Sequence, residues 1–228
     1  MGLPIKQPPF QNVGVGQTAI IPRLDMGDTC DALILKMSGT IDDAPTNFDY
    51  TDLDAIRLKL GGKTVVDGLS GAEIYTINSF MDRGVSATYL AIRFADDVAR
   101  TITGENMGGI DTSVGYSSFS LEVDIGVGDG GGGGAPALEC WMEKSRPKPE
   151  GATKLLFRAY LRGTDYFGSA AVHNLTPPFG SQAGNILARC HIFTPNDRIS
   201  RIDVKKNGVE IQGDGEKALM DFVQGLKR

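Results

Sequence analysis

The sequence lacks the features that mark several large classes of protein. No apolar run in its 228 residues approaches the ~20 residues that a membrane-spanning helix needs. The formal net charge is -5, so there is no excess of basic side chains for binding nucleic acid directly. The N-terminal stretch MGLPIKQPPF has neither a basic segment followed by an apolar core nor a cleavage signal. We therefore expect synthesis in the cytoplasm.

Residue types that carry catalytic or metal chemistry are also scarce. Cys30, Cys140 and Cys190 are widely spaced and odd in number, which argues against a disulfide framework and a zinc site and favours buried free thiols. His173 and His191 are the only histidines. His191 follows Cys190 within a predicted strand, where neighbouring side chains point to opposite faces. We expect structural roles for both histidines, no catalytic residue, no required cofactor and no enzymatic activity.

Glycine and proline are abundant instead, with 30 and 11 copies, and favour the many turns of an all-β protein. Short segments that are apolar throughout, or that alternate apolar and polar residues, predict strands. The predicted strands are residues 18–24, 32–37, 56–60, 64–66, 88–94, 119–125 and 137–142, followed by 155–161, 170–174 and 186–193. The first seven, separated by turn residues, fit one β-sandwich.

A stretch of the chain occurs twice. Residues 56–80 (IRLKLGGKTVVDGLSGAEIYTINSF) align without a gap on residues 202–226 (IDVKKNGVEIQGDGEKALMDFVQGL). Both copies predict a strand, a two-residue turn, a second strand and a short helix, and the turn dipeptides Gly-Gly and Asn-Gly both suit a tight hairpin. Ser70 and Glu73 predict a capping box at the first helix. Asp214 is the expected cap of the second.

The repeat and the loops predict a domain order. Residues 1–16 form an extended N-terminal arm, 17–145 a first β-domain, 146–153 (RPKPEGAT) a linker, and 154–228 a second domain built like the first. The glycine run 126–136 separates two predicted strands. We interpret it as a flexible hairpin loop, with an interdomain linker as the alternative.

Clustered carboxylates form the one candidate metal site. Calcium binds six to eight oxygen ligands, and acidic loops can supply them. The candidates are Asp42, Asp43, Asp49, Asp52, Asp124 and Asp129. The alternative is that these carboxylates are simply solvated in their loops. Trp141, the only tryptophan, is either a core residue or an anchor at a subunit contact.

Several long segments resemble one family of viral proteins. They are LPIKQPPFQNVGVGQTAII, AIRLKLGGKTVVDGLSGAEIYTIN, LAIRFADDVARTITGENMGGIDTSVGYSSFSLEVDIG and RISRIDVKKNGVEI. Together they resemble the major capsid proteins of corticovirus-type, membrane-containing icosahedral bacteriophages, the viral coat protein P2 family. The resemblance implies a double jelly roll, that is, two β-sandwich barrels side by side. It further implies homotrimeric, pseudo-hexagonal capsomers of a virion shell, made in the host bacterial cytoplasm.

The same resemblance implies partners. These are other copies of the chain, neighbouring capsomers, a vertex or penton protein and an internal viral membrane. We expect the arm, Met1 to Gly16, to face the particle interior, so that its deletion leaves folding intact and impairs assembly. The alternative function is a β-sandwich module that binds carbohydrate or a receptor, as a spike does.

The second copy of the repeat ends early. The first copy is followed by Met81 to Ser145, with three more predicted strands, whereas the second is followed almost at once by Arg228. We therefore expect an incomplete second barrel. A missing C-terminal portion is the preferred explanation; closure by another chain and a reduced half-barrel are the alternatives.

Overall fold

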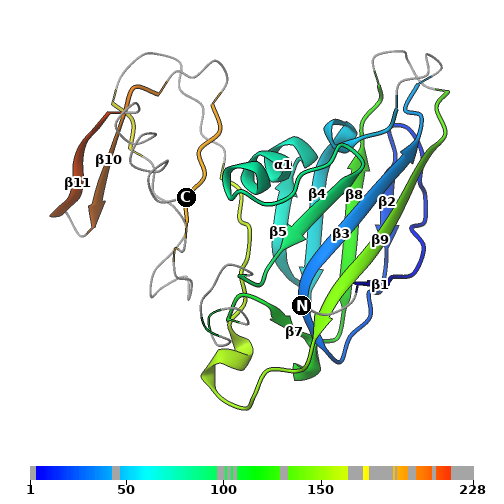
Figure 1. Ribbon diagram of the computed structural model, residues 1–228, viewed down its shortest axis with the longest axis horizontal. Coiled ribbons are helices and arrows are strands. Elements are labelled where there is room, and N and C mark those ends of the chain that lie inside the picture. The colour runs from blue at the N-terminus through cyan, green and yellow to red at the C-terminus, as the bar shows by residue number, and fades with distance from the viewer. Residues whose placement is uncertain are drawn as a thin grey trace. The chain divides into compact units, whose positions relative to one another are not determined.

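The computed structural model describes residues 4–42, 47–96, 101, 104, 107–128, 133–163, 172–174, 187, 189–194, 199–206 and 209–216. The chain divides into two compact units. The first holds Met1–Ser79 and Arg83–Leu175, and the second holds Phe80–Asp82 and Thr176–Arg228. A β-sandwich makes up most of the first unit (Figure 1).

Two antiparallel sheets form this sandwich. The sheet that we call the β9 sheet has the order β1 (Pro4–Lys6), β9 (Pro136–Ser145), β3 (Thr29–Gly39) and β6 (Tyr89–Arg93), with β7 (Ile110–Asp111) also pairing with β3. The β8 sheet has the order β2 (Thr18–Ile21), β8 (Phe119–Ile125), β4 (Leu53–Leu60) and β5 (Lys63–Leu69). The edge strands are therefore β1 and β6 in one sheet, and β2 and β5 in the other.

The chain passes repeatedly from one sheet to the other, as a jelly roll requires. Of the sandwich strands that follow one another in sequence, only β4 and β5 pair with each other. Their turn is the predicted Gly61-Gly62, and both glycines have positive φ, 54° and 82°. Strands β8 and β9 lie in opposite sheets, so the prediction that the glycine run closes a hairpin is wrong. Two strands of alternating pattern separated by a glycine run can equally be joined by a crossover between the sheets.

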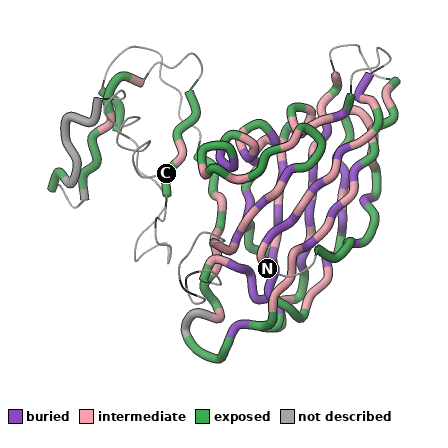
Figure 2. Tube along the Cα trace, viewed as in Figure 1, coloured by how far each residue is buried: buried purple, intermediate pink, exposed green. Residues whose placement is uncertain are grey.

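The core lies between the two sheets. Strand β8 alternates buried and half-buried residues along its whole length, as its sequence FSLEVDI predicts. Figure 2 shows this alternation along the neighbouring strands too. The largest fully buried side chains include Phe48, Phe94 and Phe119. Cys30 and Cys140 are buried free thiols, whereas Cys190 is exposed, which corrects its predicted burial.

Helix α1 (Gly71–Phe80) follows β5 directly, as predicted. The capping box is present: the Glu73 amide donates to Ser70 Oγ (3.2 Å), and the Ser70 amide donates to Glu73 Oε2 (2.8 Å). Ile74 and Ile77 are buried. The Asn78 side-chain amide donates to the Ala91 carbonyl (2.8 Å), so the helix ties β5 to the edge strand β6.

The second unit contains the predicted second hairpin. Strands β10 (Arg201–Lys206) and β11 (Val209–Glu216) pair antiparallel, with Lys206 opposite Val209, and the expected Asn-Gly turn between them lies outside the described residues. Asp214 lies within β11 rather than at a helix cap, and the predicted second helix falls mainly on residues 217–228, outside the described part of the chain. No strand occurs at the described positions of the predicted strands 170–174 and 186–193.

Candidate assembly surfaces

The segment after the last sandwich strand covers one side of the sandwich. We call residues 156–162 the closing segment; it lies along the edge of β5, where Val66 and Tyr160 form a parallel bridge. The Tyr160 amide donates to the Val65 carbonyl (2.7 Å), and the Asp67 amide donates to the Tyr160 carbonyl (2.9 Å). A strand was predicted over residues 155–161. The structure has instead a short 3-10 helix, η3 (Ala152–Leu155), and this single bridge.

Tyr160 also reaches the opposite sheet. Its hydroxyl donates to the Arg93 carbonyl at the end of β6. Its ring meets the buried Phe94 ring edge-on, with centroids 6.2 Å apart and planes at 63°. Arg162 donates to the Gly68 carbonyl (2.8 Å) and lies 3.4 Å from the Glu73 carboxylate. The closing segment thus joins β5, β6 and the start of α1.

A buried lysine fixes the stretch that leads to the closing segment. Lys148 is 5% exposed, and its amine donates to the carbonyls of Met107 (3.1 Å) and Leu156 (2.7 Å). Its backbone amide donates to the carboxylate of Asp111 in β7 (2.9 Å). Burial lowers the pKa of Lys148, while the nearby Asp111 and Asp31 act in the opposite direction. The predicted linker 146–153 is therefore packed against the sandwich at this residue.

The N-terminal arm covers the other side. Strand β1 pairs with β9, placing Pro4 opposite Glu143 and Lys6 opposite Trp141. Further along the arm, Gln11 exchanges two backbone hydrogen bonds of 2.9 Å with Ile20 in β2. The arm therefore spans from the edge of the β9 sheet to the edge of the β8 sheet.

Trp141 lies on the outer face of the β9 sheet and is partly exposed, so the interpretation as a core residue is wrong. The ammonium groups of Lys6 and Lys36 lie 5.4 Å and 5.9 Å from the centre of its ring. Glu139 pairs with both lysines, and the hydrogen bond from Lys6 is the main reason that its pKa is lowered. This cluster of an aromatic ring and three charges is suited to a polar protein contact.

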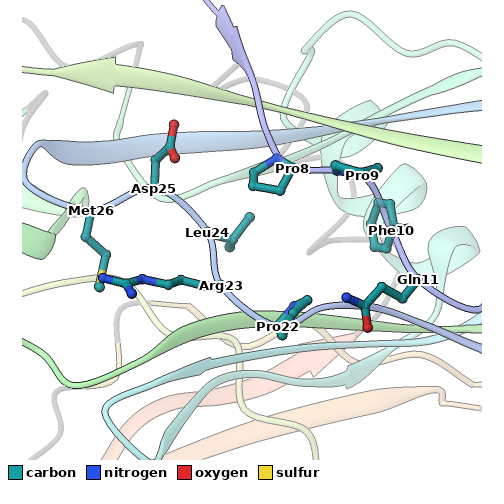
Figure 3. Close-up of a pocket in the computed structure, with 9 residues that line it drawn as sticks. All are labelled: Pro8, Pro9, Phe10, Gln11, Pro22, Arg23, Leu24, Asp25 and Met26. Carbon is teal, nitrogen blue, oxygen red and sulfur yellow. The ribbon is translucent and has the colours of Figure 1, made fainter.

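A depression of about 530 Å³ lies beside the arm (Figure 3). Its walls are the arm and the connection from β2 to β3, and its lining residues are Pro8, Pro9, Phe10, Gln11, Pro22, Arg23, Leu24, Asp25 and Met26. Phe10 and Leu24 are the buried members of this set. Asp25 receives a hydrogen bond from Lys144 (3.3 Å) and from the Gln7 side chain (3.4 Å). Its carboxylate therefore already has partners within the fold.

The carboxylates predicted as calcium candidates have partners of several kinds. Asp49 caps the 3-10 helix η1 (Tyr50–Asp52), and Asp52 accepts from the Asp49 amide (2.9 Å). Burial is the main cause of the raised pKa of Asp52. Asp124 pairs with Arg57 (2.8 Å) and accepts from the Thr18 hydroxyl (2.8 Å).

The remaining candidates add no metal cluster to the described structure. Asp42 is buried at 5% exposure, whereas Asp43 and Asp129 lie outside the described residues. Within the described residues, no three His, Cys, Asp or Glu side chains are grouped so that they could hold a metal ion.

Among the described helices, none combines the length and apolar character needed to cross a membrane. His191 has a pKa lowered mainly by burial, and His173 lies in a short described stretch, 172–174.

Comparisons with known proteins agree with the sandwich. The family model described as viral coat protein P2 N-terminal domain matches residues 4–145, more than half of the chain. Among solved structures, the chain is similar to the major capsid protein P2 from Bacteriophage PM2, with a TM-score of 0.52 and 19% identity. The match covers 64% of this chain and 51% of that one, so this chain spans about half the length of that relative. No curated protein matches the chain.

Proposed function

Because the chain belongs to the viral coat protein P2 family, we propose that it is the major capsid protein of a virus and builds the shell of the virion. The family is one of structural proteins, not enzymes. The observation that carries the proposal is the family match over residues 4–145, which coincides with the strands β1 to β9 of one sandwich. Its side surfaces are covered by the chain's own arm and closing segment, which suits a subunit that must remain soluble before assembly.

We propose further that the subunit is a double jelly roll, with the first barrel in residues 17–145 and the second beginning after the 146–153 connection. The support is the repeat: β10 and β11 form the same kind of hairpin as β4 and β5. Three such subunits would present six similar barrels, so a trimer could occupy a pseudo-hexagonal position in an icosahedral shell. Neighbouring capsomers, a vertex protein and an internal membrane are the further partners in this proposal.

The mass of the protein in solution tests the proposal. Light scattering after size-exclusion chromatography should give three times the mass of the chain, and negative-stain microscopy at high concentration should show hexagonal arrays. A monomer that forms no arrays and binds glycans would instead support the carbohydrate-binding alternative. The same measurements on a product extended beyond Arg228 would show whether assembly needs a longer second barrel.

Calcium binding remains a separate proposal for the loop carboxylates. Asp42 follows β3, Asp49 and Asp52 precede β4, and Asp124 lies in β8, whereas Asp43 and Asp129 are candidates from the sequence alone. A bound divalent ion would offset their mutual repulsion. After treatment with EDTA, millimolar calcium should then raise the melting temperature. An unchanged melting temperature would leave these carboxylates as solvated or internally paired groups.

A further inference from the structure

We propose that residues 4–7 of the arm exchange between copies, so that β1 of one subunit pairs with β9 of its neighbour. The partner is a second copy of this chain, and the contact is an exchanged edge strand. The inference rests on the proposed shell function only in requiring that two copies lie side by side. It follows from the way in which the arm is attached to the sandwich.

The arm is attached at two separate places. From Phe10 onward it belongs to its own subunit: Phe10 is buried, and Gln11 forms a reciprocal pair of backbone hydrogen bonds with Ile20. Strand β1 is attached only by pairing with β9, and its three residues are all exposed. Gln7, the last exchanging residue, is buried, but its contacts with Cys140 and Asp25 are hydrogen bonds. Releasing residues 4–7 therefore breaks polar contacts, whereas releasing Phe10 would open the apolar core.

The link between the two attachments is Pro8-Pro9. Both residues are exposed, and neither has a backbone N–H, so changing the direction of the chain here breaks no amide hydrogen bond of the link itself. Two successive prolines also favour an extended chain. An extended, exposed link between two independent attachments is the geometry that strand exchange needs, because the released strand can reach a neighbouring edge.

The edge of β9 recognises the incoming strand through specific contacts. Lys6 pairs with Glu139 and lies over Trp141. Gln7 is 4% exposed, its amide donates to the Cys140 carbonyl (2.9 Å), and its side-chain oxygen accepts from the Asp25 amide (3.0 Å). All of these receiving groups belong to the sandwich and not to the arm.

A second copy can therefore supply β1 to the same site with the same contacts. Each contact then has nearly the same free energy whether β1 pairs with β9 of its own subunit or of a neighbour. The distance between subunits in a capsomer decides which pairing forms. Exchange joins subunits through contacts that the isolated fold already contains.

Disulfide trapping in the whole chain tests the exchange. The Gln7 amide donates to Cys140, so the alternation of antiparallel pairs makes Pro4 and Glu143 a non-hydrogen-bonded pair, the closer type, at ~4.5 Å between Cα atoms. Pro4→Cys and Glu143→Cys are made on separate chains of different mass, each also carrying Cys190→Ser to remove the exposed thiol. The two chains are co-expressed, oxidised mildly and separated without reductant.

A matched control uses a pair beyond the proline link. Ile20 lies opposite Glu122 in β8, and its backbone groups bond to Gln11, so this too is a non-hydrogen-bonded pair with β8. Ile20→Cys and Glu122→Cys on one chain should close within that chain. On separate chains they should give no linked dimer.

The three outcomes are distinct. Exchange predicts a disulfide-linked dimer from the Pro4→Cys and Glu143→Cys chains, with about half of the Pro4→Cys chains trapped when the two assemble at random in equal amounts. Trimers by light scattering without any linked dimer would overturn the exchange and leave the shell function standing. A monomer by light scattering, with no linked dimer, would overturn both.

Discussion

Tyr160 should be a major stabilising residue of the first sandwich although it lies beyond the last sandwich strand. Replacing it with alanine removes the hydroxyl that donates to Arg93 and the ring that packs on Phe94. A hydrogen bond contributes about 0.5–1.5 kcal/mol to stability, and an aromatic pair about 0.5–1.5 kcal/mol beyond its buried area. With the loss of buried ring surface, Tyr160→Ala should lower the free energy of unfolding by about 2–3 kcal/mol.

Tyr160→Phe separates the two contributions. It keeps the ring contact and leaves the Arg93 carbonyl without this donor, so the expected loss is only about 1 kcal/mol. The matched control is Tyr89, a tyrosine on β6 that is 49% exposed. Tyr89→Ala should change the free energy of unfolding by about 0.5 kcal/mol or less.

Urea unfolding followed by tryptophan fluorescence measures these differences, because Trp141 reports on the sandwich from β9. In a thermal scan, each kcal/mol corresponds to about 2–4 °C for a domain of this size. Equal unfolding midpoints for Tyr160→Ala and Tyr89→Ala would refute the inference that the closing segment stabilises the sandwich.

Three further variants test other parts of the fold. Phe10→Ala should cost about 3 kcal/mol by urea unfolding, because this arm residue is only 9% exposed; no change would mean that the arm is not part of the folding unit. Lys148→Met should cost about 2 kcal/mol in the same assay, because two carbonyls lose a buried donor, whereas Lys154→Met, which alters an exposed pair, should be neutral. Burial raises the pKa of Asp52, so its ionisation disfavours the folded state. Asp52→Asn should therefore raise the melting temperature slightly at pH 7 and lose this advantage as the pH falls below about 4; an equal gain at both pH values would contradict it.

Local signals in the sequence predicted local structure well. The Gly61-Gly62 hairpin, the Ser70–Glu73 capping box and the bounds of β8 are all present as predicted. Each depends on residues within a few positions of one another, where turn geometry, capping and alternation act directly. The antiparallel pairing of the second hairpin's strands is also confirmed.

Long-range partners could not be read from these patterns. The run FSLEVDI predicts a half-buried strand, but nothing in it tells whether the next strand pairs with it or crosses to the other sheet. Lys148 has no signal at all in the sequence, because its burial depends on carbonyls from two other segments. Trp141 alternates with buried residues of β9, and this alternation could have placed it on the outer face.

The N-terminal arm is the part of the chain whose structure differs most from what its sequence predicted. Its prolines and glycines indicated an extended segment, and we expected that it faces the particle interior and that its deletion leaves folding intact. The structure places Phe10 in the core cluster and Gln11 on the edge of β2. We now expect deletion through Phe10 to destabilise the sandwich by opening its core, whereas deletion of residues 1–7 should remove an edge strand and the hydrogen bonds that Gln7 forms with Cys140 and Asp25.

The way in which the edge strands of the two sheets are covered bears on how subunits assemble. A jelly roll built from two open sheets has four edges, and unpaired edges promote uncontrolled pairing between chains. Here α1 and the closing segment cover β5 and β6, while the arm covers β2 and pairs with β9. Helix α1, the closing segment and the part of the arm along β2 are each held by buried or multiply bonded residues. Strand β1 alone is held without a core contact of its own, so the edge of β9 is where a regulated exchange can replace uncontrolled pairing.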